Sequence, residues 1–139
     1  MTALVRPAAA PDAAALAGLW SDAARECAQH RGGAALLEDL RAGRDDAATL
    51  RDALAAGELV VVLESDVPVG FAWRRGEFIA ALYVARGERR RGHARSLVAG
   101  LLTDPHPPTD GYALPGDRAT KSLYESIGWK ARLLTMRAG

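Results

Sequence analysis

One short segment of the chain combines residue types that could hold a phosphate group. It reads Arg89-Arg90-Arg91-Gly92-His93-Ala94, and it lies between the apolar run 78–84 and a helical pattern of apolar residues that starts at Ala94. Glycine lets the backbone approach a ligand closely, and the first amides of a helix have no partner within that helix. The segment therefore predicts a strand, a turn and a helix whose amino end binds a phosphate or pyrophosphate.

The composition indicates one domain with a substantial core. The chain has 139 residues, 49% of them hydrophobic, and a formal net charge of +1. We therefore expect a single domain over residues 1–139. The near-neutral charge argues against binding of nucleic acid through the overall charge, although the basic residues are concentrated between 86 and 95, so any site for a polyanion should be local. The single cysteine, Cys27, cannot form an internal disulfide and fits the apolar face of a helix, which favours a core residue over a reactive thiol.

The sequence predicts neither a membrane segment nor a metal site. Residues 1–6 lack the apolar stretch of a signal peptide, and the longest aliphatic run, 59–63, is too short to span a bilayer. We therefore expect a cytoplasmic protein that does not bind a membrane. His30 and His106 lie at loop edges and offer no spacing suited to a metal site, so we expect no metal.

The order of expected elements predicts an α/β (α+β) fold with a mixed sheet and helices on its faces. Strands are expected at 2–6, 59–63, 69–73, 77–85, 111–114 and 130–137. Helices are expected from Pro11 to about His30, once or twice within 33–57, from 93 to about 103, and from 117 to about 127. Three consecutive antiparallel strands would thus lead into the glycine turn.

In these features the chain resembles the GNAT superfamily, the Gcn5-related N-acetyltransferases, which move an acyl group from acetyl-CoA to an amine. The family's pyrophosphate motif is Arg or Gln, two residues, Gly, one residue, then Gly or Ala, and Arg89, Gly92 and Ala94 fill it. Its second signature, Leu-Tyr followed by Gly and an aromatic residue, is matched by the segment 123–129. The resemblance covers the whole chain. It implies a mostly antiparallel mixed sheet of about six to seven strands flanked by about four helices.

The resemblance also implies that acetyl-CoA is the co-substrate and which residues bind it. They are Leu82, Tyr83, Val84, Arg89, Arg90, Arg91, Gly92, His93, Ala94, Arg95 and Asp117. The family usually has proline at position 86 and glycine at position 90, where this chain has arginine. Arg86, Arg90 or Arg95 could meet the 3′-phosphate of CoA. The usual asparagine at position 117 is aspartate here, which lies near CoA or simply caps a helix.

Two residues are candidates for moving protons. Tyr124 matches the family's tyrosine, which protonates the departing thiolate, although an aromatic residue at helical spacing can also be plain core. Glu77 is our candidate base, and its alternative is an exposed turn residue. Family members often carry this glutamate one residue later, at Phe78 here, and side chains alternate faces along a strand. Glu64 and Tyr83 are further candidates.

The acceptor is expected to be a small-molecule or peptide amine, and its site to include the acidic segment 31–57. That segment contains Glu38, Asp39, Asp45, Asp46 and Asp52, although an ordinary solvated helix face explains these charges equally well. Two other functions stay open, which are a CoA-binding domain without catalysis and a basic nucleic-acid module; we expect no nucleic-acid partner. The last strand, 130–137, would offer an edge for a homodimer or would pair within the monomer.

Overall fold

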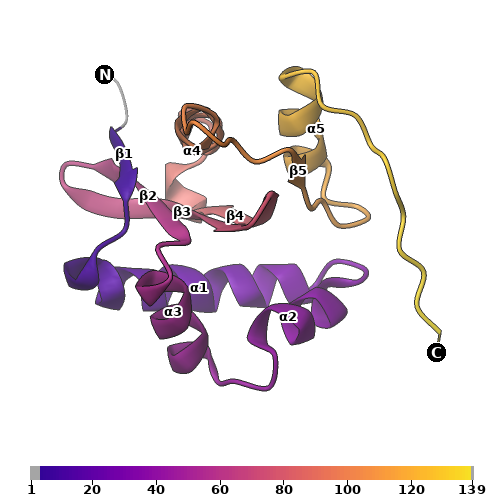
Figure 1. Cartoon of the computed structure of the whole chain (residues 1–139), viewed down its shortest axis with the longest axis horizontal. Coiled ribbons are helices and arrows are strands. Elements are labelled where there is room, and N and C mark those ends of the chain that lie inside the picture. The colour runs from indigo at the N-terminus through magenta and orange to yellow at the C-terminus, as the bar shows by residue number, and fades with distance from the viewer. Residues whose placement is uncertain (1–3, 139) are drawn as a thin grey trace.

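The computed structural model describes residues 4–138, which form a five-stranded sheet between two layers of helices (Figure 1). The strands are β1 (Leu4–Pro7), β2 (Leu59–Glu64), β3 (Val67–Arg75), β4 (Phe78–Val84) and β5 (Asp110–Gly111). The α-helices are α1 (Ala13–Ala28), α2 (Gly33–Arg41), α3 (Asp46–Ala55), α4 (His93–Leu102) and α5 (Arg118–Ser126). Two 3-10 turns, η1 (Ala10–Asp12) and η2 (Arg86–Glu88), precede α1 and α4.

The sheet has the strand order β1-β2-β3-β4-β5, so each strand lies next to its neighbour in sequence. All pairs are antiparallel except β4 and β5, which are parallel. That last pair is very short: Phe78 pairs with Asp110 and Ile79 with Gly111, and Tyr112 then donates a backbone hydrogen bond to Ile79 at 3.1 Å. Beyond this point no ladder joins the two strands, so the sheet opens along the rest of β4.

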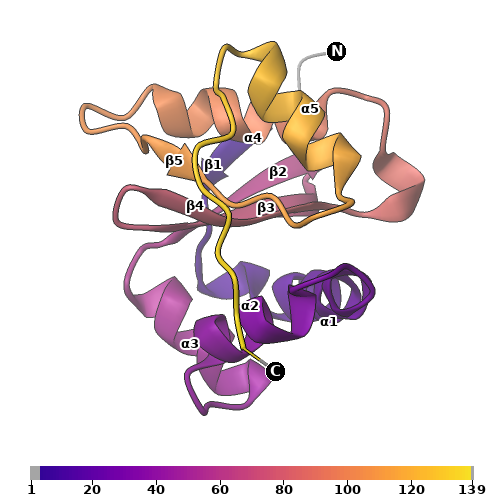
Figure 2. The ribbon, with the colours of Figure 1, turned by 90° about the vertical axis from the view of Figure 1, so that its right-hand side faces the viewer.

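Helices cover both faces of the sheet, which explains why its central strands are continuously apolar. Helices α1, α2 and α3 lie on one face, and α4 and α5 lie on the other (Figures 1 and 2). On the first face Trp20 of α1 meets Trp73 of β3 edge-on, with ring centroids 5.7 Å apart. On the second face Leu97 and Val98 of α4 pack with Ile79 of β4, and all three are buried. A strand buried on both faces needs no alternation of apolar and polar residues.

The structure corrects the expected number of elements. Residues 4–138 contain five strands, not six to seven, and five α-helices rather than four. The strand expected at 111–114 is shorter and starts at Asp110, and the first strand is β1; Thr2 and Ala3 lie outside the described residues. The meander and the helix after the glycine turn are confirmed. No helix within residues 4–138 has both the length and the apolar character needed to cross a bilayer.

The last expected strand, 130–137, is wrong. The chain from Lys130 to Ala138 forms no strand; it runs from α5 past the sheet edge toward α2 (Figure 2). Leu133 is 85% exposed and Met136 is 81% exposed. A strand needs an edge with free backbone groups, and the available edge, β5, is two residues long. The apolar pattern is present, but the neighbouring strand β5 is too short to pair with it.

Candidate functional site

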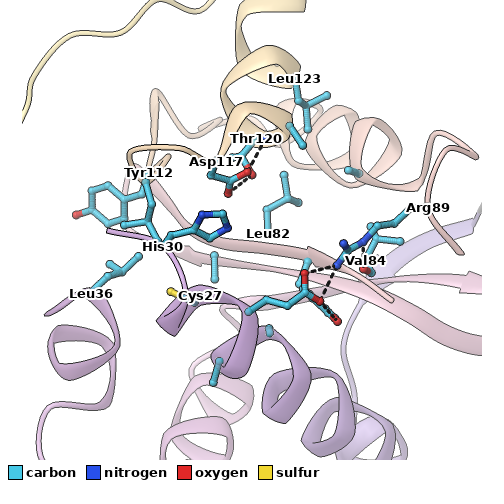
Figure 3. A pocket seen from close by; sticks show the side chains of 18 of the residues that line it. Cys27, His30, Leu36, Leu82, Val84, Arg89, Tyr112, Asp117, Thr120 and Leu123 are labelled. Atoms are coloured by element: carbon cyan, nitrogen blue, oxygen red, sulfur yellow. Dashed lines mark hydrogen bonds and ion pairs between the residues drawn. The ribbon is translucent and has the colours of Figure 1, made fainter. Parts of the chain in front are cut away.

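A cleft of about 830 Å³ lies where β4 and β5 separate (Figure 3). Helices α1 and α2 form one wall, and the turn between β4 and α4 together with the start of α5 forms the other. Ten of the residues expected to bind CoA line it: Leu82, Tyr83, Val84, Arg89, Arg90, Gly92, His93, Ala94, Arg95 and Asp117. Arg91 does not line it; its side chain donates to Glu64, which lies outside the cleft, and to Glu88, which lines it.

A β-bulge sets which backbone groups of β4 face this cleft. Trp73 pairs with Ala81 and Arg74 with Ile79, so Ala80 is an extra residue in β4. Before the bulge the carbonyl of Ile79 faces β5. After it, Ala85 donates to Val69 of β3, so by alternation the backbone groups of Leu82 and Val84 face the opening. The Leu82 amide is therefore available to a ligand that lies along β4.

The turn after β4 presents a row of unpaired amides. Arg90 and Gly92 both have positive φ, 67° and 80°, and such alternation makes adjacent N–H groups converge. The first helical bond of α4 runs from Ser96 to the carbonyl of Gly92, at 2.9 Å. The amides of residues 91–95 donate no hydrogen bond to any other group within residues 4–138. This is the strand, turn and helix that the sequence predicts; that it binds a pyrophosphate stays a prediction.

Arg89 is held in place by Glu26, a residue that the sequence analysis did not single out. Its guanidinium donates to Glu26 at 2.9 Å and to the carbonyl of Val84 at 2.9 Å, and Tyr83 donates to the same carboxylate at 2.8 Å (Figure 3). Burial opposes ionisation of Glu26, but these two donors outweigh it and hold the pKa of Glu26 below its usual value. Burial, and then the bond to Glu26, raise the pKa of Tyr83 to about 12. The pair therefore stays ionic at neutral pH, with Tyr83 protonated.

Arg91 belongs to a second charged cluster beside the turn. Its Nη1 lies 2.9 Å from both Glu64 and Glu88, and His93 Nε2 lies 3.1 Å from Glu64. A hydrogen bond between the two carboxyl groups lowers the pKa of Glu64 and raises the pKa of Glu88. This cluster holds the ring of His93 through its Nε2 atom. Glu64 is thus engaged in the cluster and does not line the cleft.

Tyr124, the candidate acid, lies beneath β5 and does not line the cleft. Its ring stacks on Trp129 with centroids 5.2 Å apart. The hydroxyl contacts the backbone of Gly111, since a side-chain carbon built on that glycine would lie 2.7 Å from it. Burial raises the pKa of Tyr124, and within residues 4–138 its hydroxyl has no hydrogen-bond partner. A protonated donor without a partner therefore lies directly behind the point where the strands separate.

The expected base and the expected acidic acceptor wall both receive little support. Glu77 is exposed in the turn before β4 and lines no cavity described here; its backbone carbonyl accepts from Thr109 and Asp110. The bulge at Ala80 follows Glu77 and does not bring it into the cleft. Among the acidic residues of 31–57, Asp46 pairs with an arginine at 2.7 Å, Asp52 pairs with another at 2.8 Å, and Asp45 caps α3. None of the acidic residues of this segment lines the cleft; its wall there is apolar.

Asp117 has the structural role that the sequence left as an alternative. Its carboxylate caps α5 by accepting from the amide of Thr120 at 3.2 Å and from its hydroxyl at 2.8 Å (Figure 3). It also lines the cleft, so a role toward CoA stays a prediction.

Cys27, in the last turn of α1, and His30, just after that helix, also line the cleft. Burial raises the pKa of the Cys27 thiol. Cys27 is half-buried, so it is less deeply placed than a core residue.

A second cavity, of about 460 Å³, adjoins the cleft at its far end. Ala80 and Tyr112 line both spaces, so they form the boundary between them. The second cavity is further lined by Glu58, Arg75, Gly76 and Phe78. Its charged residues come from the start of β2 and the end of β3, and sequence reasoning gave no signal for them.

Comparison with known proteins assigns the fold. No protein-family model matches the sequence, and no curated protein is similar enough to count as a match. Among solved structures, a GNAT-family acetyltransferase from Bacillus cereus is 18% identical with a TM-score of 0.66, covering 100% of this chain and 86% of that one. The enzyme AAC(6′)-Iy, bound to a bisubstrate analogue of CoA and acetylneamine, is 18% identical with a TM-score of 0.64, covering 100% and 99%.

A third structure, the PaiA N-acetyltransferase from Thermoplasma acidophilum in complex with coenzyme A, is 11% identical. Its TM-score is 0.69, and the match covers 95% of this chain and 92% of that one. The chain therefore has the GNAT acetyltransferase fold, as the motifs 89–94 and 123–129 predict.

Proposed function

We propose that this protein is an N-acetyltransferase that moves an acetyl group from acetyl-CoA to a primary amine within a ternary complex. One observation carries the proposal: the unpaired amides of residues 92–95 lie at one end of a cleft whose floor is the open edge of β4. A pyrophosphate on these amides would direct the rest of CoA along Val84 and Leu82 toward Ala80. Structures of the same fold were solved with CoA or a CoA analogue, which supports this use of the cleft.

The reaction needs a donor to the carbonyl oxygen, an acid and a base, and residues of the chain are available for the first two. The amine nitrogen attacks the thioester carbonyl, so a C–N bond forms while the C–S bond breaks. The amide of Leu82 is placed to donate to the carbonyl oxygen as negative charge develops there. Tyr124, protonated at neutral pH, is our candidate to give a proton to the departing thiolate, which requires its hydroxyl to become accessible beside Gly111. A base takes the proton that the amine loses.

The first experiment is a calorimetric titration of the purified protein with acetyl-CoA, followed by a thiol-release assay with a panel of amines. We expect one equivalent of acetyl-CoA to bind saturably and an amine to be acetylated. Absence of binding at millimolar ligand would contradict the proposal.

The burial of Tyr124 favours a second function, which is a CoA-binding domain without turnover. A hydroxyl that stays beneath β5 would not reach a thiolate. Saturable CoA binding without acetylation of any amine in the panel would support that function.

A further inference from the structure

We infer that the acceptor of the proposed reaction is a free α-amino acid or a zwitterion of the same pattern, bound in the second cavity between Glu58 and Arg75. This inference rests on the proposed function. The cavity shares Ala80 and Tyr112 with the cleft. A molecule in the cavity would therefore face the acyl end of an acetyl-CoA that lies along β4 with its pyrophosphate on the turn between β4 and α4. Its volume of about 460 Å³ is within the range of small-molecule sites.

The two charged residues of this cavity have opposite signs and are not paired. Neither Glu58 nor Arg75 has an ion-pair partner within 4.0 Å among residues 4–138, whereas Arg89 and Arg91 at the other end of the cleft are both held by carboxylates. Both are nevertheless oriented by one side chain, Trp73. Its indole N–H donates to Glu58 Oε1 at 3.3 Å, and the guanidinium carbon of Arg75 lies 5.8 Å from its ring centroid.

A zwitterion fits this arrangement better than the other amines. Its ammonium group would meet the free oxygen of Glu58, and its carboxylate would meet Arg75, which can hold a carboxylate through two parallel hydrogen bonds. A polyamine would bring a second positive charge toward Arg75. A peptide amino terminus has an amide in place of the carboxylate beside its amine. The stacked rings of Phe78 and Tyr112, 5.2 Å apart, provide an apolar wall for the substituent.

The same geometry supplies the proton acceptor that Glu77 does not provide. Glu58 lines the cavity where the amine would lie, so the ammonium proton passes to its carboxylate, directly or through water, before the neutral nitrogen attacks. The proton then leaves to solvent, and the products are an N-acetylated amino acid and CoA.

The test compares amines that differ only in the carboxylate. Thiol release is measured with the twenty standard amino acids and with their carboxamides, which imitate peptide amino termini, and CoA binding is measured on the same samples. We expect at least one amino acid to have a kcat/KM ten or more times that of its amide. Arg75→Gln should reduce that ratio to within about threefold of one by weakening the acid alone, and Arg75→Lys should restore part of it.

Control measurements separate this inference from the proposed function. Arg51→Gln removes an exposed arginine of α3 that lines neither cavity and should change neither the ratio nor CoA binding. Glu58→Gln should lower kcat/KM for the amino acid at least tenfold without changing CoA affinity. If CoA binds but amides are used as well as acids, or if no compound is used, the inference is wrong while CoA binding stands. Failure to bind CoA overturns the proposed function.

Discussion

The two ends of the cleft differ in how their charges are satisfied. At the end formed by the turn between β4 and α4, the guanidinium groups of Arg89 and Arg91 are bound by carboxylates, and unpaired backbone amides face the space. At the opposite end Glu58 and Arg75 face a cavity and are paired with no charged residue within residues 4–138. At the first end two arginines are fixed by carboxylates of the protein, whereas at the second end both charged side chains are left for a ligand to neutralise.

This difference indicates a division of work within one cleft. A row of fixed amides suits a ligand portion that is always the same, since a pyrophosphate gains from donors that need no reorganisation. Side chains without internal partners suit the portion that must be selected, because selection depends on charges that only the correct ligand neutralises. We therefore expect substitutions at the two ends to affect different measurements.

The largest effect is expected from Gly92→Glu. This substitution would disrupt the end of the cleft formed by the turn between β4 and α4, the phosphate end. The variant places a carboxylate against the unpaired amides, and we expect affinity for acetyl-CoA to fall by at least about a hundredfold. Gly43→Glu is the matched control, because both glycines have φ of +80° and open space around the position of the new side chain. Both variants carry similar backbone strain of about 1 kcal/mol. Calorimetry that shows equal affinity for the two variants would contradict the proposed phosphate site.

Tyr124→Phe tests the point between the two ends. If the hydroxyl protonates the thiolate, turnover should fall at least about tenfold while CoA affinity is retained. The free energy of unfolding should stay the same or rise by about 1 kcal/mol, because the buried hydroxyl has no partner within residues 4–138. Thiol release and urea unfolding provide the two readouts. Unchanged turnover would exclude Tyr124 as the acid.

Identical substitutions at Glu26 and Glu58 compare the two ends directly. Glu26→Gln removes the charge that holds Arg89 and Tyr83, so we expect the free energy of unfolding to fall by about 1–2 kcal/mol. Glu58→Gln removes a charge without an ionic partner and should change it by less than about 0.5 kcal/mol. Equal losses in urea unfolding would mean that both ends are structural and that the proposed contrast does not exist.

The phenol of Tyr83 gives a spectroscopic measure of the phosphate end. Its pKa of about 12 lies above the ordinary value of 10.0, so its contribution to stability is complete below about pH 10 and is lost as the pH rises through 12. Absorbance titration of the wild type against Tyr83→Phe should isolate this transition. In the Glu26→Gln background it should move toward lower pH, while burial, the larger cause, keeps it above the ordinary value. A transition that does not move would mean that Glu26 is not its partner in solution.

The smallest expected effect concerns the arginine at position 90. Its φ of 67° is in the left-handed region, where glycine is at ease and a longer side chain is strained. Arg90→Gly should therefore raise the free energy of unfolding by about 0.5 kcal/mol, the relief of strain being partly offset by a more flexible unfolded chain. A clear loss of stability would show that the arginine side chain makes contacts that outweigh the strain.

The sequence predicted the local features of the site well, because a turn that follows a strand and precedes a helix depends on neighbours in the chain. Gly92 and the amides after it are of this kind, and so is Asp117 as a helix cap. The expected last strand failed because pairing depends on the edge that other segments leave free. A segment rich in apolar residues does not indicate whether such an edge exists.

The residues that the sequence did not predict lie far along the chain from the residues with which they share a site. Glu26 reaches Arg89, 63 positions away, because α1 crosses beneath β4. Glu58 and Arg75 line one cavity because β2 and β3 pair antiparallel, which places the end of β3 beside the start of β2. Neither pair can be recognised as a sequence motif, because the number of residues between its members is not fixed by local structure. The acidic residues of 31–57 misled for a related reason: their neighbouring arginines neutralise Asp46 and Asp52 within the helical layer.

The extra residue in β4 has a consequence for how this protein can change in evolution. Ala80 shifts the alternation of the strand. The backbone groups of Ile79 before it and of Leu82 and Val84 after it therefore all face the edge of β4 where β5 and the opening lie. Deleting one residue here would restore an uninterrupted alternation and exchange the faces of every later position in the strand. Lineages therefore cannot lose this position and keep the cleft. In an alignment of descendants, we expect no gap at position 80.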